Sequence, residues 1–159
     1  MGKGGILEIS KINEIAVMAD VHEPEVRSYN MSRIKGKNTK PEILLRKLLF
    51  KHGFRFRIHV KNLPGKPDIV LPKYKTVIFV HGCFWHGHEG CKYFVMPKTR
   101  TEFWSKKIHA NIQRDQMAES LLKEKGWRIV KVWECDLKSI NIEKTLENLL
   151  PFLKNLNKL

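Results

Sequence analysis

The sequence predicts an α/β fold in which a mixed central sheet is flanked by helices. Its apolar patterns run in the order helix, three strands, helix, strand and helix, and this interleaving favours helices packed on a sheet. A chain of 159 residues is long enough for one domain with its own hydrophobic core. Its 42% hydrophobic and 29% charged residues are typical of a globular protein.

The first helix and the first strand follow a polar N-terminal region. Asn38–Glu42 combines a capping side chain, an early proline and an acidic residue, as the first turn of a helix often does. Leucines then form an apolar stripe, and Gly53 ends the helix. Apolar and polar side chains alternate over residues 54–60, which predicts a half-buried strand, and residues 63–67 have the composition of a turn.

The remaining apolar segments predict three strands and two helices. In chain order they are strands at 68–71 and 76–80, a helix from Thr101 to Gly126, a strand at 128–133, and a helix that opens at Asn141. Gly126 supplies a C-terminal stop, and Pro151 is expected to kink or break the last helix.

We divide the chain into an N-terminal extension (1–17), a basic arm (18–40) and a main domain (41–159). Residues 6–17 have the pattern of a short amphipathic helix, to which no function is assigned. The arm is polar and basic, so we expect it to order on phosphates, although a solvated tail would have the same composition. Its expected phosphate contacts are Arg33, Lys35 and Lys37.

The net charge of +14 points to a polyanionic partner, most commonly nucleic acid, and a merely basic surface is the alternative. No apolar run approaches the roughly 20 residues that span a bilayer, and the N-terminus lacks the apolar core of an export signal. Three cysteines without such a signal argue against a disulfide framework. We expect a cytoplasmic monomer that associates with the nucleoid when bound to DNA.

Cysteine and histidine side chains predict a structural zinc site. Cys83, His88 and Cys91 form a C-x4-H-x2-C pattern, and Cys135 follows the predicted strand 128–133. Three thiolates and one imidazole make a complete tetrahedral set that leaves no position for water. The alternative is that the cysteines are ordinary buried thiols and that His88 lies on the surface.

A second set of side chains suggests metal-dependent nuclease chemistry. Asp68 begins one predicted strand and His81 ends the next, so a carboxylate and the main-chain carbonyl of Val80 would offer oxygen ligands to magnesium. His81 and His86 suit phosphate contact or general-base work. The alternative is that Asp68 caps a turn, and the Glu-x-Lys pattern of many nucleases is replaced here by Phe79-Val80-His81.

Two large aromatic residues, Phe84 and Trp85, lie between the predicted zinc ligands. A metal-bound loop would push them outward, where aromatic side chains can wedge between base pairs. Packing into the core beside the zinc is the alternative.

Several stretches between Met18 and about Lys138 resemble the very-short-patch repair (Vsr) DNA mismatch endonucleases. They are MADVH, RSYNM, LPGKPDIV, VIFVHGCFWH, PKTRTEFWSKKIHANIQRD and GWRIVKVWEC. The resemblance implies a restriction-endonuclease-like fold with a structural zinc, so that 41–159 would be a nuclease domain. It also implies magnesium-dependent nicking 5′ of the mispaired thymine at T·G mismatches that arise from deamination of 5-methylcytosine. Mismatch-repair proteins are implied as possible partners.

The same resemblance assigns roles to individual residues. Asp68 and the Val80 carbonyl would bind magnesium, and His86 would be the general base, assisted by Asp115. The other implied residues are His81 and Glu42 in the catalytic centre, Phe84, Trp85 and Trp104 in an aromatic wedge, and Met31 intercalating from the opposite groove. Because the loop has one residue more between its zinc cysteines than one relative in that family, His86 stays the alternative to His88 as the zinc ligand.

Three other functions fit parts of the same sequence. A related nuclease with a relaxed mismatch or sequence preference would share the catalytic residues. A zinc-stapled DNA-binding module without catalysis, or a basic structural protein, would share the charge and the cysteines.

Overall fold

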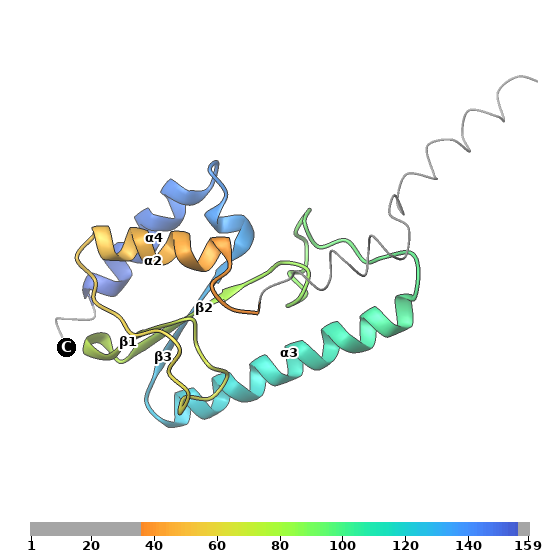
Figure 1. Cartoon of the computed structure of the whole chain (residues 1–159), viewed down its shortest axis with the longest axis horizontal. Helices are drawn as coiled ribbons and strands as arrows, with labels where there is room; N and C mark the ends of the chain where they lie inside the picture. The colour runs from red at the N-terminus through yellow and green to blue at the C-terminus, as the bar shows by residue number, and fades with distance from the viewer. Residues whose placement is uncertain (1–35, 156–159) are drawn as a thin grey trace, which may run out of the picture.

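The computed structural model describes residues 36–155, and the predicted helix at 6–17 and the side chains of Met31, Arg33 and Lys35 lie outside that range. Within it, the elements are α2 (Lys40–Lys51), β1 (Ile69–Leu71), β2 (Thr76–His81), α3 (Thr101–Glu124), β3 (Arg128–Trp133) and α4 (Ile142–Asn155), with short 3-10 turns at Pro72–Tyr74 and Glu134–Leu137. Figure 1 shows α2 and α4 on one face of the sheet and α3 on the other.

The sheet of the described chain is mixed and has the order β1-β2-β3. β1 and β2 are antiparallel, with Ile69 opposite Ile78. β2 and β3 are parallel, with Thr76 beside Arg128 and His81 beside Trp133. Because the two parallel strands end side by side, the loops that follow them leave from the same edge of the sheet.

Two apolar cores lie on opposite faces of this sheet. Leu45 and Leu49 of α2 and Leu149 and Leu153 of α4 pack with Ile78 on one face. On the other face the core consists of Val70, Val77, Phe79 and Leu122, the last from α3. Successive residues of β2 therefore point to opposite cores, as the alternation of a strand requires. Burial on both faces explains why β1 and β2 read as continuous apolar runs.

The bounds of α2, β2, α3 and β3 confirm the sequence-based expectations to within a few residues. The strand predicted at 54–60 is absent, because only Arg57 pairs with Val70 as an isolated bridge. His59 then takes a left-handed conformation (φ 56°), which turns the chain away from the sheet. The last helix continues through Pro151 without a break, and Leu149 and Leu153 on either side of the proline are both buried.

None of the helices in residues 36–155 is long and apolar enough to cross a membrane.

Neighbouring leucines near the end of α3 provide a test of the second core. Leu122 is fully buried, whereas Leu121 is 47% exposed. We expect Leu122→Ala to lower the free energy of unfolding by roughly 2–5 kcal/mol, because it leaves a cavity in the core. Leu121→Ala should change it by about 0.5 kcal/mol or less. Denaturant unfolding of both variants measures the difference, and equal losses would contradict this packing.

Candidate active site and metal centre

One cleft of about 950 Å³ collects the side chains for which the sequence suggests catalysis. It opens beside the start of α2, the start of β1, the end of β2 and the middle of α3. The predicted residues that line it are Glu42, Asp68, Val80, His81, His86 and Asp115. The chain folds so that segments more than 70 residues apart meet at this edge of the sheet.

Asp68 is fixed by the neighbouring strand. Its Oδ2 atom accepts a hydrogen bond of 2.7 Å from the main-chain N–H of Val80. Burial raises the pKa of Asp68 from 3.8 to about 6, although the Val80 hydrogen bond lowers it, and the nearby Glu42 carboxylate raises it further. A carboxylate that has lost water and faces a second negative charge is stabilised by a cation, which the cleft leaves room to bind.

His86 and Asp115 form a hydrogen-bonded pair across the cleft. The Nδ1 atom of His86 lies 2.6 Å from Oδ2 of Asp115, which projects from α3. Burial alone would raise the pKa of Asp115, but the hydrogen bond and the positive charge of His86 hold it below its ordinary value. An ionised carboxylate only accepts hydrogen bonds, so Nδ1 of His86 carries the proton and Nε2 is the free acceptor in the neutral ring.

His81 stacks on His86 with 3.9 Å between ring centroids and 7° between ring planes. Burial lowers the pKa of His81 to about 4, and the charge of the neighbouring His86 lowers it further. Two imidazoles in such contact disfavour a charge on both, so His81 is neutral near pH 7.

His81, His86 and Asp115 also place one ligand atom each within 4.8 Å of the others, as a metal site would. The stacking argues against a shared ion, because the nitrogen lone pairs lie in the ring planes and parallel planes do not meet at one point. Asp115 already bonds Nδ1 of His86. The arrangement thus favours proton transfer over metal binding.

Glu42 is 4% exposed and its carboxylate is occupied by hydrogen bonds at the start of α2. Oε1 accepts from the N–H (3.2 Å) and the hydroxyl (2.8 Å) of Thr39, and Oε2 accepts from the N–H of Asn38 (2.9 Å). Glu42 therefore caps its own helix and adds negative charge near Asp68.

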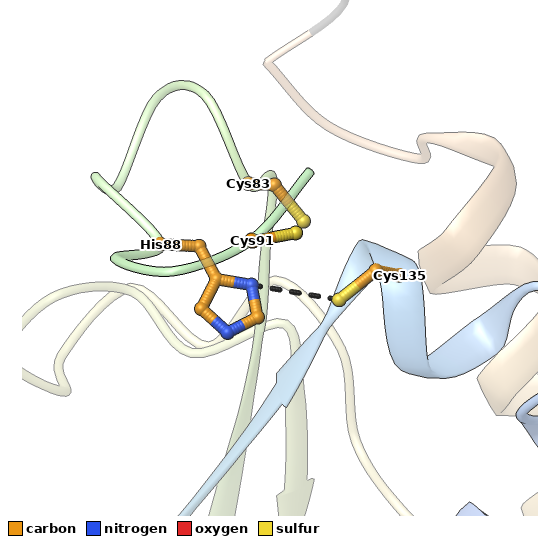
Figure 2. Close-up of side chains that lie close together, drawn as sticks. All are labelled: Cys83, His88, Cys91 and Cys135. Carbon is orange, nitrogen blue, oxygen red and sulfur yellow. Dashed lines mark hydrogen bonds between the residues drawn. The ribbon is translucent and has the colours of Figure 1, made fainter. Parts of the chain in front are cut away.

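The predicted zinc ligands meet at a second position, separate from the cleft. Cys83, His88, Cys91 and Cys135 bring their ligand atoms within 4.8 Å of one another. Figure 2 shows the first three on the loop after β2 and Cys135 on the turn after β3, with Cys135 Sγ 3.4 Å from His88 Nδ1.

The donor set and spacing of this Cys3His cluster fit a tetrahedral metal ion. Zinc–sulfur bonds of about 2.3 Å arranged tetrahedrally place sulfur atoms roughly 3.8 Å apart, within the spacing found here. Burial and the neighbouring sulfur atoms raise the pKa of Cys135 to about 12, and burial also raises the pKa of Cys83, whereas the main-chain hydrogen bond from Tyr93 lowers the pKa of Cys91. A bound cation would replace the protons that Cys83 and Cys135 hold. The structure also assigns His88, and not His86, to the cluster.

Trp133 joins the two sites. Its ring stacks on His88, with 4.0 Å between centroids and an angle of 6° between planes. It also meets His81 edge to face at 5.4 Å. The loop between the sites is held to α3 by Asn111, whose Nδ2 atom donates a 2.9 Å hydrogen bond to the carbonyl of Trp85.

Sequence reasoning missed Trp133, Asn111 and Arg46 as site residues. A signal existed for Asn111, because it precedes Asp115 by one helical turn and so shares its face. Trp133 lies two residues before the predicted zinc ligand Cys135. Arg46 follows Glu42 by one turn and lines the same cleft.

The aromatic residues Phe84, Trp85 and Trp104 contact one another, with ring centroids 5.2–6.0 Å apart. All three are half-buried and belong to neither of the two apolar cores of residues 36–155. Basic side chains occupy the rim of the nearby cleft. They are Lys37, Lys40, Lys61, Lys66 and Lys107.

Comparison with known proteins identifies the family of this chain. Residues 19–92 match the sequence model described as DNA mismatch endonuclease Vsr. The DNA mismatch endonuclease Vsr of Escherichia coli (strain K12) is 50% identical over 121 residues, which cover 76% of this chain and 77% of the relative. The chain belongs to the Vsr family of DNA mismatch endonucleases.

Further Vsr relatives are named as nicking enzymes. The type II nicking enzyme V.XorIIP of Xanthomonas oryzae pv. oryzae (strain KACC10331 / KXO85) is 50% identical over 134 residues, or 84% of this chain and 98% of the relative. V.NmeAIP of Neisseria meningitidis serogroup A / serotype 4A (strain DSM 15465 / Z2491) is 50% identical over 122 residues, covering 77% and 86%. This Vsr-family chain is thus an endodeoxyribonuclease, and its mixed sheet between helices fits the expected restriction-endonuclease-like fold.

Two glycines with nearly the same backbone conformation test how tightly the turn before Asp68 is packed. A Cβ on Gly65 (φ +70°) would lie 2.8 Å from Cβ of Ala118, whereas one on Gly126 (φ +73°) would meet nothing within 4 Å. We expect Gly65→Ala to lower the free energy of unfolding by at least about 1 kcal/mol more than Gly126→Ala, because both strain the backbone but only one overpacks α3. Thermal or denaturant unfolding checks this. A larger loss for Gly126→Ala would refute it.

Proposed function

We propose that this protein nicks one DNA strand 5′ of the mispaired thymine at T·G mismatches, which arise when 5-methylcytosine is deaminated. The reaction is magnesium-dependent hydrolysis of a phosphodiester bond. The observation that carries the proposal is the convergence of Asp68, Val80 and the His86–Asp115 pair in one cleft of a Vsr-family chain.

The cleft suits a hard divalent cation. The Asp68 carboxylate and the main-chain carbonyl of Val80 would hold Mg²⁺, because this ion prefers oxygen ligands and completes its shell with water and phosphate. When bound, Mg²⁺ supplies charge neutralisation at the scissile phosphate. Asp68 is prepared for that role because Val80 fixes its carboxylate and burial strips it of water.

His86 is the proposed general base. Its free Nε2 takes a proton from the attacking water, while the Asp115 carboxylate fixes the ring and stabilises the imidazolium that forms. Positioned general bases typically contribute about 10²–10⁴-fold in rate. His81 stays neutral and holds the His86 ring in place by stacking.

The aromatic cluster is the proposed mismatch sensor. Phe84, Trp85 and Trp104 form a partly exposed wedge beside the cleft, and Met31 would enter from the opposite groove. A mispaired step is easier to unstack than a paired one, so a rigid wedge turns weak stacking into selectivity. Lys37, with Arg33 and Lys35 of the arm, would neutralise DNA phosphates.

Zinc is the proposed occupant of the Cys3His cluster, with a structural role. Four protein ligands leave no open position for chemistry. The ion would tie the loop carrying Phe84, Trp85 and His86 to the end of β3, and misplacing a catalytic group by about 1 Å can reduce the rate on the order of a hundredfold. We further propose that the protein acts as a cytoplasmic monomer on chromosomal DNA, with mismatch-repair proteins as partners.

A related nuclease with a broader mismatch or sequence preference is the second candidate. The several relatives named as type II nicking enzymes favour it, because they show that the family contains more than one named activity. No described side chain distinguishes the flanking bases of one site from those of another.

A strand-resolved cleavage assay tests the main proposal. Duplexes that carry each mismatch, and a fully paired duplex, are incubated with the protein with and without Mg²⁺. We expect a single nick 5′ of the thymine in T·G duplexes, only with Mg²⁺. Nicking of all mismatches at similar rates would favour the second candidate, and intact T·G duplexes at every Mg²⁺ concentration would exclude the main one.

Asp68→Asn separates a nuclease from a pure DNA-binding module. It removes the charge that binds the cation but keeps the shape and an oxygen for the Val80 N–H. We expect nicking to fall by at least about 10³-fold, whereas the DNA affinity measured without divalent ions should stay within about threefold of the original protein. An unchanged rate would remove Asp68 from the catalytic centre.

Paired histidine variants test the zinc proposal. We expect about one zinc per chain by elemental mass spectrometry, loss of that zinc in His88→Ala, and its retention in His86→Ala. The metal-free variant should also unfold at a lower temperature, since structural zinc contributes folding free energy. A folded protein without zinc, or zinc lost from His86→Ala alone, would show that the ligand assignment is wrong.

A further inference from the structure

Arg46 has no role in the chemistry described so far, although it lines the active-site cleft. It lies on α2, one turn after Glu42, and its side chain is only 11% exposed. Arginine is seldom buried unless it is paired, so its contacts indicate what keeps it there.

The guanidinium of Arg46 binds three groups, two at the start of α2 and one at the start of β1. Nη2 donates to Glu42 Oε2 at 2.9 Å and to the main-chain carbonyl of Asp68 at 3.1 Å. Nη1 donates to Oδ1 of Asn38 at 2.7 Å. One side chain thus connects the residue before the helix cap, the buried acid of α2 and the backbone of Asp68.

This geometry leaves one nitrogen of the guanidinium without a partner. Nε of Arg46 is buried and has no hydrogen-bond partner among residues 36–155. Buried donors are nearly always paired, so an exception calls for an explanation. In the observed orientation the two terminal nitrogens bond to Asn38, Glu42 and Asp68, and Nε has no acceptor.

We propose that Arg46 is a positioning residue that sets the Asp68 carboxylate for cation binding by clamping the Asp68 backbone to the start of α2. The inference rests on the proposed nuclease function. The Val80 N–H fixes the side chain of Asp68, and Arg46 fixes its main chain, so both ends of the ligand are held. Loss of the clamp frees the Asp68 backbone on the side that faces α2.

The planar fork of arginine is required for this role. A lysine at the same position keeps the positive charge beside Glu42, but its single ammonium cannot reach Asn38, Glu42 and the Asp68 carbonyl in the fixed fork geometry. Arg46→Lys therefore tests the shape of the side chain while its positive charge is kept.

The experiment compares Arg46→Lys and Arg46→Met with Lys47→Met. Lys47 is the next residue of α2, is exposed and lies outside the cleft, so its variant controls for the loss of one positive charge.

Mn²⁺ binding is measured by electron paramagnetic resonance on complexes with a synthetic T·G duplex already nicked 5′ of the thymine. The Asp68→Asn complex gives the background. Single-turnover nicking against Mg²⁺ concentration, duplex affinity without divalent ions, and thermal unfolding complete the set.

For both Arg46 variants we expect Mn²⁺ binding at least threefold weaker, a Mg²⁺ concentration for half-maximal nicking raised by a similar factor, and a maximal rate at least tenfold lower. Duplex affinity should stay within twofold of Lys47→Met. If Arg46→Met does not fold, Arg46→Lys alone decides the question.

Two results would overturn the role of Arg46: Arg46→Lys behaving like the original protein, or both Arg46 variants matching Lys47→Met in Mn²⁺ binding. A protein that never nicks T·G duplexes would instead refute the proposed function, and the Mn²⁺ titration would still decide whether Arg46 positions Asp68.

Discussion

The parallel pairing of β2 with β3 determines where the functional side chains of the described chain lie. Because His81 pairs with Trp133, both strands end at the same level of the sheet. The loop after β2 and the turn after β3 therefore leave side by side, and Cys135 comes within reach of the loop cysteines. Asp68 joins them because β1 runs antiparallel to β2 and begins where β2 ends. A shift in the β2–β3 register would therefore disrupt the Cys3His cluster and the active-site cleft together.

Trp133 connects the Cys3His cluster to the His86–Asp115 pair through ring contacts. His88 lies flat on its ring, and His81 meets it edge to face and then stacks on His86. Rotation of any ring in this series moves its neighbours, since packed aromatic side chains leave little free space. Ring contacts therefore connect the Cys3His cluster to His86, the proposed general base.

The sequence was sufficient for features that depend on local patterns and residue type. β3 and the Cys3His set were predicted because an apolar run with a clear start and stop, and a complete set of soft ligands, are visible without a fold. The strand expected at 54–60 was wrong, because alternation also occurs in an extended segment that touches the sheet at one bridge. The sequence favoured His88 over His86 as the fourth ligand, and the position of His88 in the Cys3His cluster agrees with that choice. The contacts of Arg46 depend on tertiary neighbours that no local pattern contains.

Glu42 changes the electrostatic character of the start of α2. The first turn of a helix normally attracts anions through its free amide groups. In α2 the Glu42 carboxylate accepts the N–H groups just before that turn and places its own charge beside them. Arg46 pairs with the same carboxylate at 2.9 Å, so this wall of the cleft holds a balanced ion pair, while lysines line the rim. The start of α2 is thus capped by its own carboxylate and is not open to an external anion.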